Sequence, residues 1–292
     1  MTIHYGKLYV VATPIGNLAD FSYRAVEILK QVDYIAAEDT RHVRVLLQHY
    51  GITNKLLALH QHNEEQAAPG LLEKLQQGMS IALVSDAGTP LLSDPGMPLV
   101  KLLKNAGIEV SPIPGACALI AALSVSGLPL NRFEFEGFLA RTSAARIAFL
   151  NSKRNCESTW AFYEASHRIE ATLQDMLKAL PPEREIVIAR EITKLHETII
   201  KATLAEVSAL VTQDPNMRKG EFVVIVAGAV TEKQVEALTD EQQRILQLLL
   251  RECSTKTAVA LAVEITGARK KALYQAALDS TFTKSVEDDA NI

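Results

Sequence analysis

The stretch Ser85-Asp86-Ala87-Gly88-Thr89-Pro90-Leu91-Leu92-Ser93-Asp94-Pro95-Gly96 decides the fold. It follows a short apolar run, 81–84, which is typical of a buried strand. The residues after it predict an amphipathic helix from Met97 to Ala106, with Asp94 as its N-cap and Pro95 at its first position. The stretch is therefore a strand-to-helix loop, and in open α/β sheets ligands bind beyond the carboxyl ends of the strands.

This loop carries more polar groups than a turn requires. Gly88 and Gly96 allow the backbone to approach a ligand closely or to adopt a positive φ. Asp86 lies two residues past the strand, where its carboxylate can reach a bound hydroxyl or amine. The loop is thus a predicted binding site, and an ordinary strand-to-helix connection is the alternative.

Residues 1–127 alternate strands and helices. The predicted strands are 8–12, 34–37, 56–59, 81–84 and 109–113. The predicted helices are 22–32, a segment ending at His49, 64–77, 97–106 and 116–126. This alternation predicts an α/β domain with a mostly parallel, doubly wound sheet.

The remainder of the chain divides into three further parts. Residues 128–230 predict a second α/β domain with a mixed sheet, from strands at 158–163, 185–190, 197–202 and 221–227 and one helix at 168–180. A polar linker at 229–234 precedes a small helical domain at 235–280, and residues 281–292 predict a disordered acidic tail.

Composition excludes several classes of protein. Of the 292 residues 48% are hydrophobic and 22% charged, and the net charge of −4 argues against a globally basic nucleic-acid coat. Cys117, Cys156 and Cys253 have neither a metal-binding spacing nor a disulfide pattern, which suits the reducing cytoplasm. No signal peptide and no apolar stretch long enough to span a bilayer are found, so no membrane partner is expected.

Common cofactor and catalytic motifs are missing. The first predicted strand leads into Pro14-Ile15-Gly16, without the G-x-G-x-x-G of dinucleotide-binding proteins. There is no P-loop and no H-E-x-x-H or paired C-x-x-C, so no metal site is predicted. Ser85 lacks the G-x-S-x-G context of a hydrolase nucleophile.

Four loops should gather at one edge of the first sheet: Thr13–Leu18, Glu38–Arg41, Ser85–Gly96 and Pro114–Cys117. The resulting pocket has few fixed positive charges, which favours a neutral or cationic nucleoside-like ligand over a polyphosphate. In the second loop two carboxylates could hold a polar group or act as a base, and the alternative is that Asp39 caps the following helix.

Five segments together resemble one family: 12–18 (ATPIGNL), 37–41 (AEDTR), 85–96, 114–116 (PGA) and 191–197 (EITKLHE). They are similar to the ribosomal RNA small subunit methyltransferase I family, which belongs to the tetrapyrrole-methylase-like, class III methyltransferases. The resemblance covers about residues 7–228. One departure is Pro14-Ile15-Gly16, where many relatives carry a G-x-G-P-G-like turn, and it suggests a substrate-side role for this loop.

The resemblance implies two α/β domains of the class III type and a small helical domain. It implies S-adenosyl-L-methionine as cofactor, 2′-O-methylation of a cytidine ribose in the decoding region of 16S rRNA, the small ribosomal subunit as partner, and a homodimer. The implied cofactor-binding residues are Asp86, Ala87, Gly88, Ser93, Asp94, Ala116, Cys117, Tyr163 and Ala189. A ribose hydroxyl must lose its proton in or near the transition state, and the candidates for the base or for a group that orients the nucleophile are Asp39, Glu191, Lys194 and His196. The alternative for each is a salt-bridge partner at the surface.

The helical domain carries a second signal. Thr266-Gly267-Ala268 predicts a turn between two short helices, as in a helix-turn-helix. Arg269, Lys270 and Lys271 open the last helix and suit contact with RNA phosphates, and Arg41 is a further RNA-binding candidate. The alternative for the basic residues is a solvated face of a small bundle.

Two other functions stay open. One is a small-molecule methyltransferase of the same fold, of the kind that acts on tetrapyrrole precursors. The other is a non-catalytic ribosome assembly factor that holds S-adenosyl-L-methionine as a structural ligand. The basic helical domain and the 38–41 loop favour the RNA methyltransferase.

Overall fold

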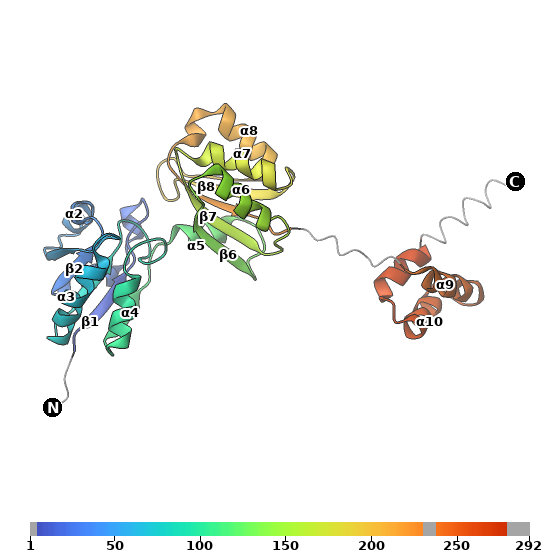
Figure 1. Cartoon of the computed structure of the whole chain (residues 1–292), viewed down its shortest axis with the longest axis horizontal. Helices are drawn as coiled ribbons and strands as arrows, with labels where there is room; N and C mark the ends of the chain where they lie inside the picture. The colour runs from blue at the N-terminus through green and yellow to red at the C-terminus, as the bar shows by residue number, and fades with distance from the viewer. Residues whose placement is uncertain (1–4, 230–237, 279–292) are drawn as a thin grey trace. The chain divides into compact units, whose positions relative to one another are not determined.

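A computed structural model describes residues 5–229 and 238–278 (Figure 1). The chain divides into two compact units, Met1–Ala229 and Val230–Ile292. The predicted linker beyond Ala229 and the predicted acidic tail at 281–292 lie outside the described residues. Within the described ranges no helix is long and apolar enough to cross a membrane.

The first sheet is parallel throughout. Its strands are β1 (Lys7–Val11), β2 (Tyr34–Ala37), β3 (Lys55–Ala58), β4 (Ile81–Val84) and β5 (Glu109–Ile113). Their spatial order, β3-β2-β4-β1-β5, places the early strand β1 next to the later strands β4 and β5. The predicted parallel sheet is confirmed.

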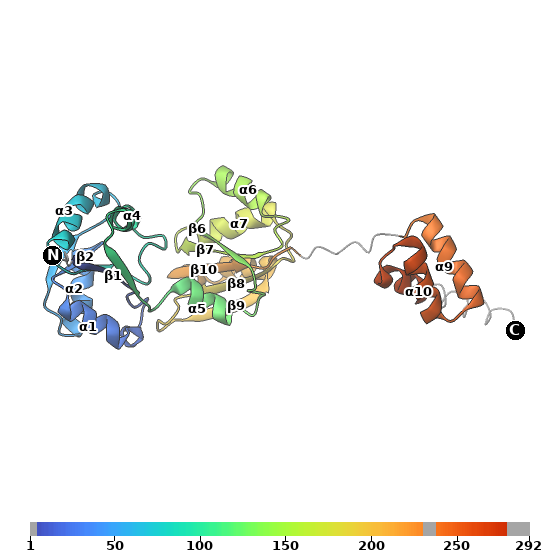
Figure 2. The same ribbon diagram turned by 90° about the horizontal axis from the view of Figure 1, so that it is seen from below.

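Helices cover both faces of this sheet, as its doubly wound connections require (Figure 2). A short 3₁₀ turn (η1, Leu18–Asp20) precedes α1 (Tyr23–Gln31), which shares one apolar core with α2 (Thr40–His49). On the opposite face, α3 (Glu64–Gln76) and α4 (Met97–Asn105) form a second core. Both faces of the short strands are thus buried, which explains why β4 is a continuous apolar run.

The predicted start of α4 is wrong. Gly96, with φ of +121°, is the N-cap in place of Asp94. The Gly96 N–H donates to Oε2 of Glu64 at 2.7 Å, so a carboxylate from α3 satisfies the helix terminus. A β-carbon at Gly96 would lie 2.8 Å from Cδ2 of Leu83, so only glycine fits there. Asp94 is therefore released from capping and lines a cavity.

The second sheet is mixed, as predicted. Its strands are β6 (Phe133–Phe138), β7 (Thr159–Ala165), β8 (Glu185–Arg190), β9 (Thr198–Thr203) and β10 (Glu221–Val226), in the order β6-β7-β10-β8-β9. β6 and β7 are parallel and the other pairs are antiparallel. The sequence prediction missed β6, in which a glycine interrupts the alternation of Phe and Glu.

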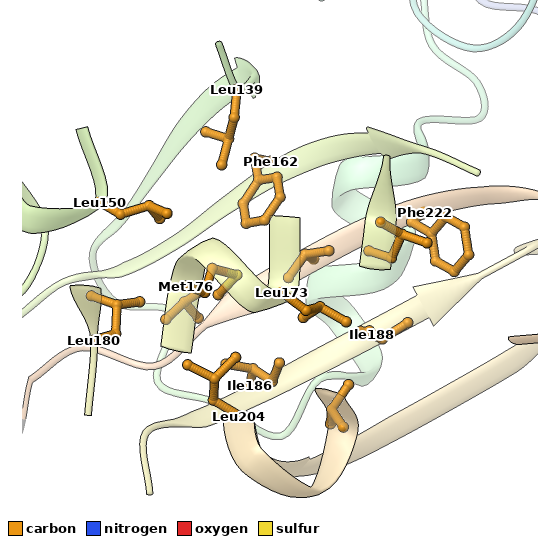
Figure 3. Packing of buried hydrophobic residues seen from close by; sticks show 14 of the residues in the cluster. Leu139, Leu150, Phe162, Leu173, Met176, Leu180, Ile186, Ile188, Leu204 and Phe222 are labelled. Carbon is orange, nitrogen blue, oxygen red and sulfur yellow. The ribbon is translucent and has the colours of Figure 1, made fainter. Parts of the chain in front are cut away.

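The prediction of a single helix in this part of the chain is wrong. The described residues contain α6 (Ser143–Ser152) and α8 (Leu204–Gln213) besides the predicted α7 (Ile169–Ala179), and a 3₁₀ turn, η2 (Pro215–Arg218). A capping box between Thr203 and Glu206 begins α8. The three helices pack on one face of the sheet around Phe162, Met176 and Ile188 (Figure 3). The chain's one tryptophan, Trp160, is fully buried in this core.

The helix α5 (Ala118–Val125) covers the other face of the second sheet. Its buried residues Leu119 and Leu123 contact a cluster that includes Ala161 of β7 and Val223 of β10. The sequence prediction grouped this helix with residues 1–127. In the structure it leaves the carboxyl edge of the first sheet and packs on the second, so it links the two.

The C-terminal unit is helical, as predicted. It contains α9 (Asp240–Glu252) and α10 (Thr255–Thr266), and residues 270–278 are helical as well. Gly267, with φ of +68°, ends α10 in the left-handed conformation that glycine favours. Leu246, Val259 and Leu273 contribute to one small core from the three helical segments.

Candidate active site

The four loops at the carboxyl edge of the first sheet meet as predicted. Thr13 and Gly88 exchange backbone hydrogen bonds of 2.8 and 3.1 Å. The Thr89 hydroxyl donates to the carbonyl oxygen of Ala116 at 3.1 Å. The backbone N–H of Asp39 donates to Oδ1 of Asp86 at 3.0 Å. These bonds fix the loop after β4 against each of its neighbours.

A cavity of about 410 Å³ lies between these loops and the second sheet, within the first unit. This volume is in the range of small-molecule sites. Most of the residues predicted to bind the cofactor or act on the nucleophile line it: Asp86, Ala87, Gly88, Ser93, Asp94, Cys117, Tyr163, Ala189, Glu191 and Lys194. The structure therefore brings together residues that are as much as 108 positions apart in sequence, from Asp86 to Lys194.

Other predicted residues do not line this cavity. Asp39 caps α2 by accepting from the Arg41 N–H at 2.8 Å, and its carboxylate pairs with the Arg41 guanidinium. These bonds hold the pKa of Asp39 well below its usual range. The structure therefore agrees with the capping alternative for Asp39. His196 is exposed, and Ala116 lines an adjoining groove.

The sequence analysis did not select several lining residues. Ile15 and Glu38 lie in two of the predicted loops, and their position after a strand was the available signal. Phe138, Ile192 and Glu221 come from the second sheet, where no motif marks them. Their contribution depends on how the second sheet packs against the first, which residue spacing does not show.

Acidic groups dominate the cavity. Burial raises the pKa of Glu38, and the nearby carboxylates of Asp86 and Asp94 raise it further. Burial raises the pKa of Asp94 to about 6; the Ser85 hydroxyl opposes this shift and the charge of Asp86 adds to it. Such mutual repulsion favours a bound cation. Among the described residues, no group of three or more His, Cys, Asp and Glu could hold a metal ion.

Lys194 is the one lysine or arginine among the described residues that line the cavity. Its Nζ donates to Oε1 of Glu191 and Oε2 of Glu221, both at 2.8 Å. Burial alone would lower the pKa of Lys194, but the two carboxylates outweigh it and raise the pKa. Burial alone would raise the pKa of Glu191, and the bonds from Lys194 and the Glu221 N–H outweigh it and lower the pKa. Both side chains are therefore charged at neutral pH.

The loop after β1 lies against the side chain of Lys194. A β-carbon at Gly16, whose φ is +154°, would lie 2.4 Å from Cγ of Lys194. The loop after β1 can approach the lysine stem only because residue 16 has no side chain. Any side chain at position 16 would therefore force the Lys194 stem or the loop to move.

Unusual backbone conformations are confined to two loops of the site. Among the described residues the non-glycine positions with positive φ are Leu91 and Ser93, after β4, and Glu191 and Thr193, after β8. Such conformations are costly for residues with a side chain and persist where the surroundings enforce them. Ser93 and Glu191 line the cavity from opposite sides, which supports its choice as the candidate site.

Asp94→Asn should stabilise the first unit at pH 7.5. The pKa of Asp94 is raised from 3.8 to about 6 in the folded state. The contribution of Asp94 to folding stability is therefore most favourable at low pH, where the side chain is protonated. This contribution is lost as the pH rises to about 6. After allowance for solvent screening, we expect a gain of roughly 1–2 kcal/mol at pH 7.5 that shrinks toward pH 4.5. Thermal unfolding monitored by circular dichroism measures it.

Asp33→Asn is the control for this prediction. Its carboxylate accepts from the N–H and the hydroxyl of Ser80, which lower its pKa. This substitution should therefore destabilise the protein at pH 7.5. Equal effects of the two variants, or a gain for Asp94→Asn that is independent of pH, would contradict the prediction.

Comparison with known proteins agrees with this fold. The family profile described as "Tetrapyrrole (Corrin/Porphyrin) Methylases" matches residues 7–208. The profile of the "RsmI C-terminal HTH domain" matches residues 236–281, which is close to the extent of the predicted helical domain. The fold and the site thus define a methylase of the tetrapyrrole class with an added C-terminal domain.

Comparison with individual proteins identifies the family within this class. Ribosomal RNA small subunit methyltransferase I of Escherichia coli O157:H7 is 52% identical over 274 residues, which cover 94% of this chain and 95% of that protein. The chain therefore belongs to the ribosomal RNA small subunit methyltransferase I family.

Solved structures share the fold of the first unit. The methyltransferase CobJ is 22% identical, with a TM-score of 0.58 over 78% of this chain and 96% of that one. A uroporphyrin-III C-methyltransferase from Thermus thermophilus, in complex with S-adenyl homocysteine, is 18% identical, with a TM-score of 0.50 over 75% of this chain and 96% of that one. At this identity the likeness shows the fold alone.

Proposed function

We propose that this chain transfers a methyl group from S-adenosyl-L-methionine to ribosomal RNA of the small subunit. The acceptor that we propose is the 2′-hydroxyl of a cytidine ribose in the decoding region of 16S rRNA. Family membership supports the methyltransferase activity and the RNA. The observation that carries the proposal is the acidic lining of the cavity, in which Lys194 is the one lysine or arginine among the described residues.

The residues present fit S-adenosyl-L-methionine. When bound, this cofactor supplies a methyl group attached to a positively charged sulfonium. The carboxylates of Glu38, Asp86 and Asp94 lie close enough together to raise one another's proton affinity, and a cation would relieve their repulsion. Polyphosphate cofactors would be repelled by the same groups. We assign the cofactor to the wall formed by the loop after β4, together with Tyr163 and Ala189 of the second sheet.

Glu191 and Lys194 form the side of the cavity that we assign to the nucleophile. Because its pKa is raised, Lys194 keeps its proton and cannot serve as a base at neutral pH. Its ammonium group would instead stabilise negative charge that develops on the ribose oxygen. Glu191 holds Lys194 at 2.8 Å and thereby orients it. Its charged carboxylate is the group on this side that we assign to accept the hydroxyl proton, while S-adenosylhomocysteine leaves. Asp39 and His196, which do not line the cavity, are weaker candidates.

The C-terminal unit supplies the charge that the cavity lacks. Arg269, Lys270 and Lys271 are all exposed, and within the described residues no hydrogen bond or ion pair holds their side chains. We assign them to RNA phosphates, which position a protein on nucleic acid without carrying sequence information. Arg41 is a further candidate, although its guanidinium pairs with Asp39.

We also propose a homodimer that works in the cytoplasm. The helix α5 exposes Ile120 by 54% and Val125 by 55%, beside a groove formed with the 89–92 and 114–117 segments. A second copy of the chain would cover this apolar surface. The described cysteines are all free thiols, which suits a reducing compartment. Light scattering should give twice the mass of the chain, and the mass of one chain would exclude the dimer.

The proposed reaction is tested with tritiated S-adenosyl-L-methionine and small ribosomal subunits. Label should appear in 16S rRNA, and mapping should place it on one cytidine ribose. Free 16S rRNA, incubated in parallel, separates the two possible forms of the substrate. A truncated chain that ends at residue 229 should lose activity on RNA. Methylation of a small molecule that survives this truncation would favour the tetrapyrrole-type alternative, and binding without transfer would favour an assembly factor.

Asp86→Ala should weaken cofactor binding by about 10- to 150-fold, which corresponds to roughly 1.5–3 kcal/mol for a lost hydrogen bond to a charged group. The reason is its place in the cavity and its bond to the Asp39 N–H, which ties the loops after β4 and β2 together. Isothermal titration calorimetry measures the dissociation constant.

Asp33→Ala is a matched control. Asp33 accepts from the Ser80 N–H at 2.7 Å and so joins the same two strands, β2 and β4, at the opposite edge of the sheet. It should leave cofactor affinity unchanged. If both variants bind equally well, Asp86 does not contact the cofactor.

A further inference from the structure

The strand β6 contains a bulge beside the cavity. Phe133 lies opposite Thr159 of β7, and Phe135 lies opposite Ala161, but the next pair is Phe138 with Tyr163. One extra residue is thus inserted between Phe135 and Phe138. The insertion includes Gly137, whose φ of +63° is the left-handed conformation that glycine adopts readily.

The bulge changes the face on which Phe138 lies. Side chains alternate along a regular strand, so without the extra residue position 137 would share the face of Phe135, and Phe138 would point to the other side. With the bulge, Phe138 lies opposite Tyr163 on the face that opens to the cavity. Its ring centroid is 5.7 Å from that of Tyr163, which is 4.9 Å from that of Phe135.

Phe138 is largely exposed although it has aromatic neighbours. It is 55% exposed although it packs against Tyr163, so a large part of the ring surface is available to a ligand. Bulges next to functional sites commonly redirect a side chain. The exposed ring, the bulge that directs it and the cavity wall that it joins are three separate observations that point to a contact with a bound group.

The charge of the cavity limits what that group can be. The lining carries several carboxylates and, in the described part of the chain, Lys194 as its one lysine or arginine. RNA phosphates would be repelled from such a surface, whereas an uncharged base and its ribose would not. A base that enters a pocket is commonly held by stacking on an aromatic side chain.

We propose that Phe138 binds the RNA substrate by stacking on the base of the nucleotide that receives the methyl group. This inference rests on the proposed function. It assigns recognition of the target base to β6, while phosphate contacts fall to the C-terminal unit. The Phe138 ring contacts Tyr163 in a tilted arrangement, and the rest of its surface is open to the base.

Phe138→Leu tests the proposal because it keeps an apolar side chain and removes the ring. Stacking of one base on an aromatic ring is worth enough to change affinity by about 5- to 150-fold. We expect the KM for small ribosomal subunits to rise by this factor and the affinity for S-adenosyl-L-methionine to change less than twofold. Phe138→Trp should restore the KM to within a few-fold of the wild type.

Phe133→Leu is the control. Phe133 is on the same strand and face and is 39% exposed, but it does not line the cavity. It should leave both constants unchanged. Direct binding of single-stranded RNA, measured in the presence of S-adenosylhomocysteine, gives the same comparison without turnover.

Each outcome decides one question. If Phe138→Leu weakens cofactor binding and leaves RNA binding unchanged, the ring contacts the cofactor and the proposal is wrong. If neither affinity changes, or if Phe133→Leu has an equal effect, the proposal is also wrong. If the wild-type protein binds RNA but methylates no ribosomal substrate, the proposed function fails, and the RNA-binding comparison still decides the role of Phe138.

Discussion

Replacing Lys194 with alanine should lower the turnover number for RNA methylation by about 100- to 1000-fold, the effect of removing one donor that stabilises a developing oxyanion. The two carboxylates at 2.8 Å keep this lysine charged and fixed at the cavity wall. Because the residue belongs to the side assigned to the nucleophile, affinity for S-adenosyl-L-methionine should stay within about twofold, a change of less than 0.5 kcal/mol. Single-turnover kinetics and calorimetry measure the two quantities separately.

Two further variants sharpen this experiment. Lys194→Met keeps the stem that packs against Gly16 and removes the charge, so it should match the alanine variant if charge is what matters. Lys201→Ala removes a lysine of β9 outside the cavity, which bonds to the Gly127 carbonyl, and should leave turnover unchanged. Glu191→Gln should act in the same direction as Lys194→Ala. Loss of cofactor binding with normal turnover at saturation would place Lys194 on the cofactor side instead.

Neutralising Arg269, Lys270 and Lys271 together should weaken RNA binding on the order of 100-fold at low salt. Three adjacent residues fan across about 200° of a helix, so they cannot all read one base edge. If they contact phosphates of single-stranded RNA, each loss should reduce the slope of log affinity against log salt by about 0.7. Cofactor affinity should not change, because the cavity belongs to the other compact unit. Filter binding across a salt series measures the slope.

A second triple variant, which removes three positive charges elsewhere in the same unit, is the control. Arg244, Arg251 and Lys256 are exposed on α9 and at the start of α10, so their replacement by alanine changes the net charge of the unit equally. An equal loss of slope in both triple variants would indicate a general effect of charge. An unchanged slope in the first would show that its residues do not contact phosphate. The methylated nucleotide should be the same in all of these proteins.

The parallel sheet could be predicted because its strands alternate with turns and helices along the chain. The second sheet was harder to predict, since two of its features depend on contacts made only in the folded chain. Gly137 breaks the alternation of β6, so the pattern does not identify a strand. α8 begins at the Thr203–Glu206 capping box, a local signal that the sequence interpretation did not use.

The candidate site could likewise be predicted only in part. Loops after parallel strands were predicted to converge, and hydrogen bonds between Asp39 and Asp86 and between Thr89 and Ala116 join them. Asp94 was assigned to the helix cap because Asp is favoured there, but a carboxylate 30 residues earlier in the chain, on Glu64, meets the helix terminus instead. Phe138 could not be selected, because its position depends on a bulge defined by the register with β7.

The burial of Trp160 determines what fluorescence can report about this protein. As the chain's one tryptophan, it is the source of essentially all indole emission. It lies in the apolar core of the second sheet, and its Nε1–H donates to no acceptor among the described residues. An indole in such surroundings emits at shorter wavelength than one in water. A red shift therefore signals the loss of the second sheet, whereas the helix-turn-helix unit can unfold without altering the spectrum.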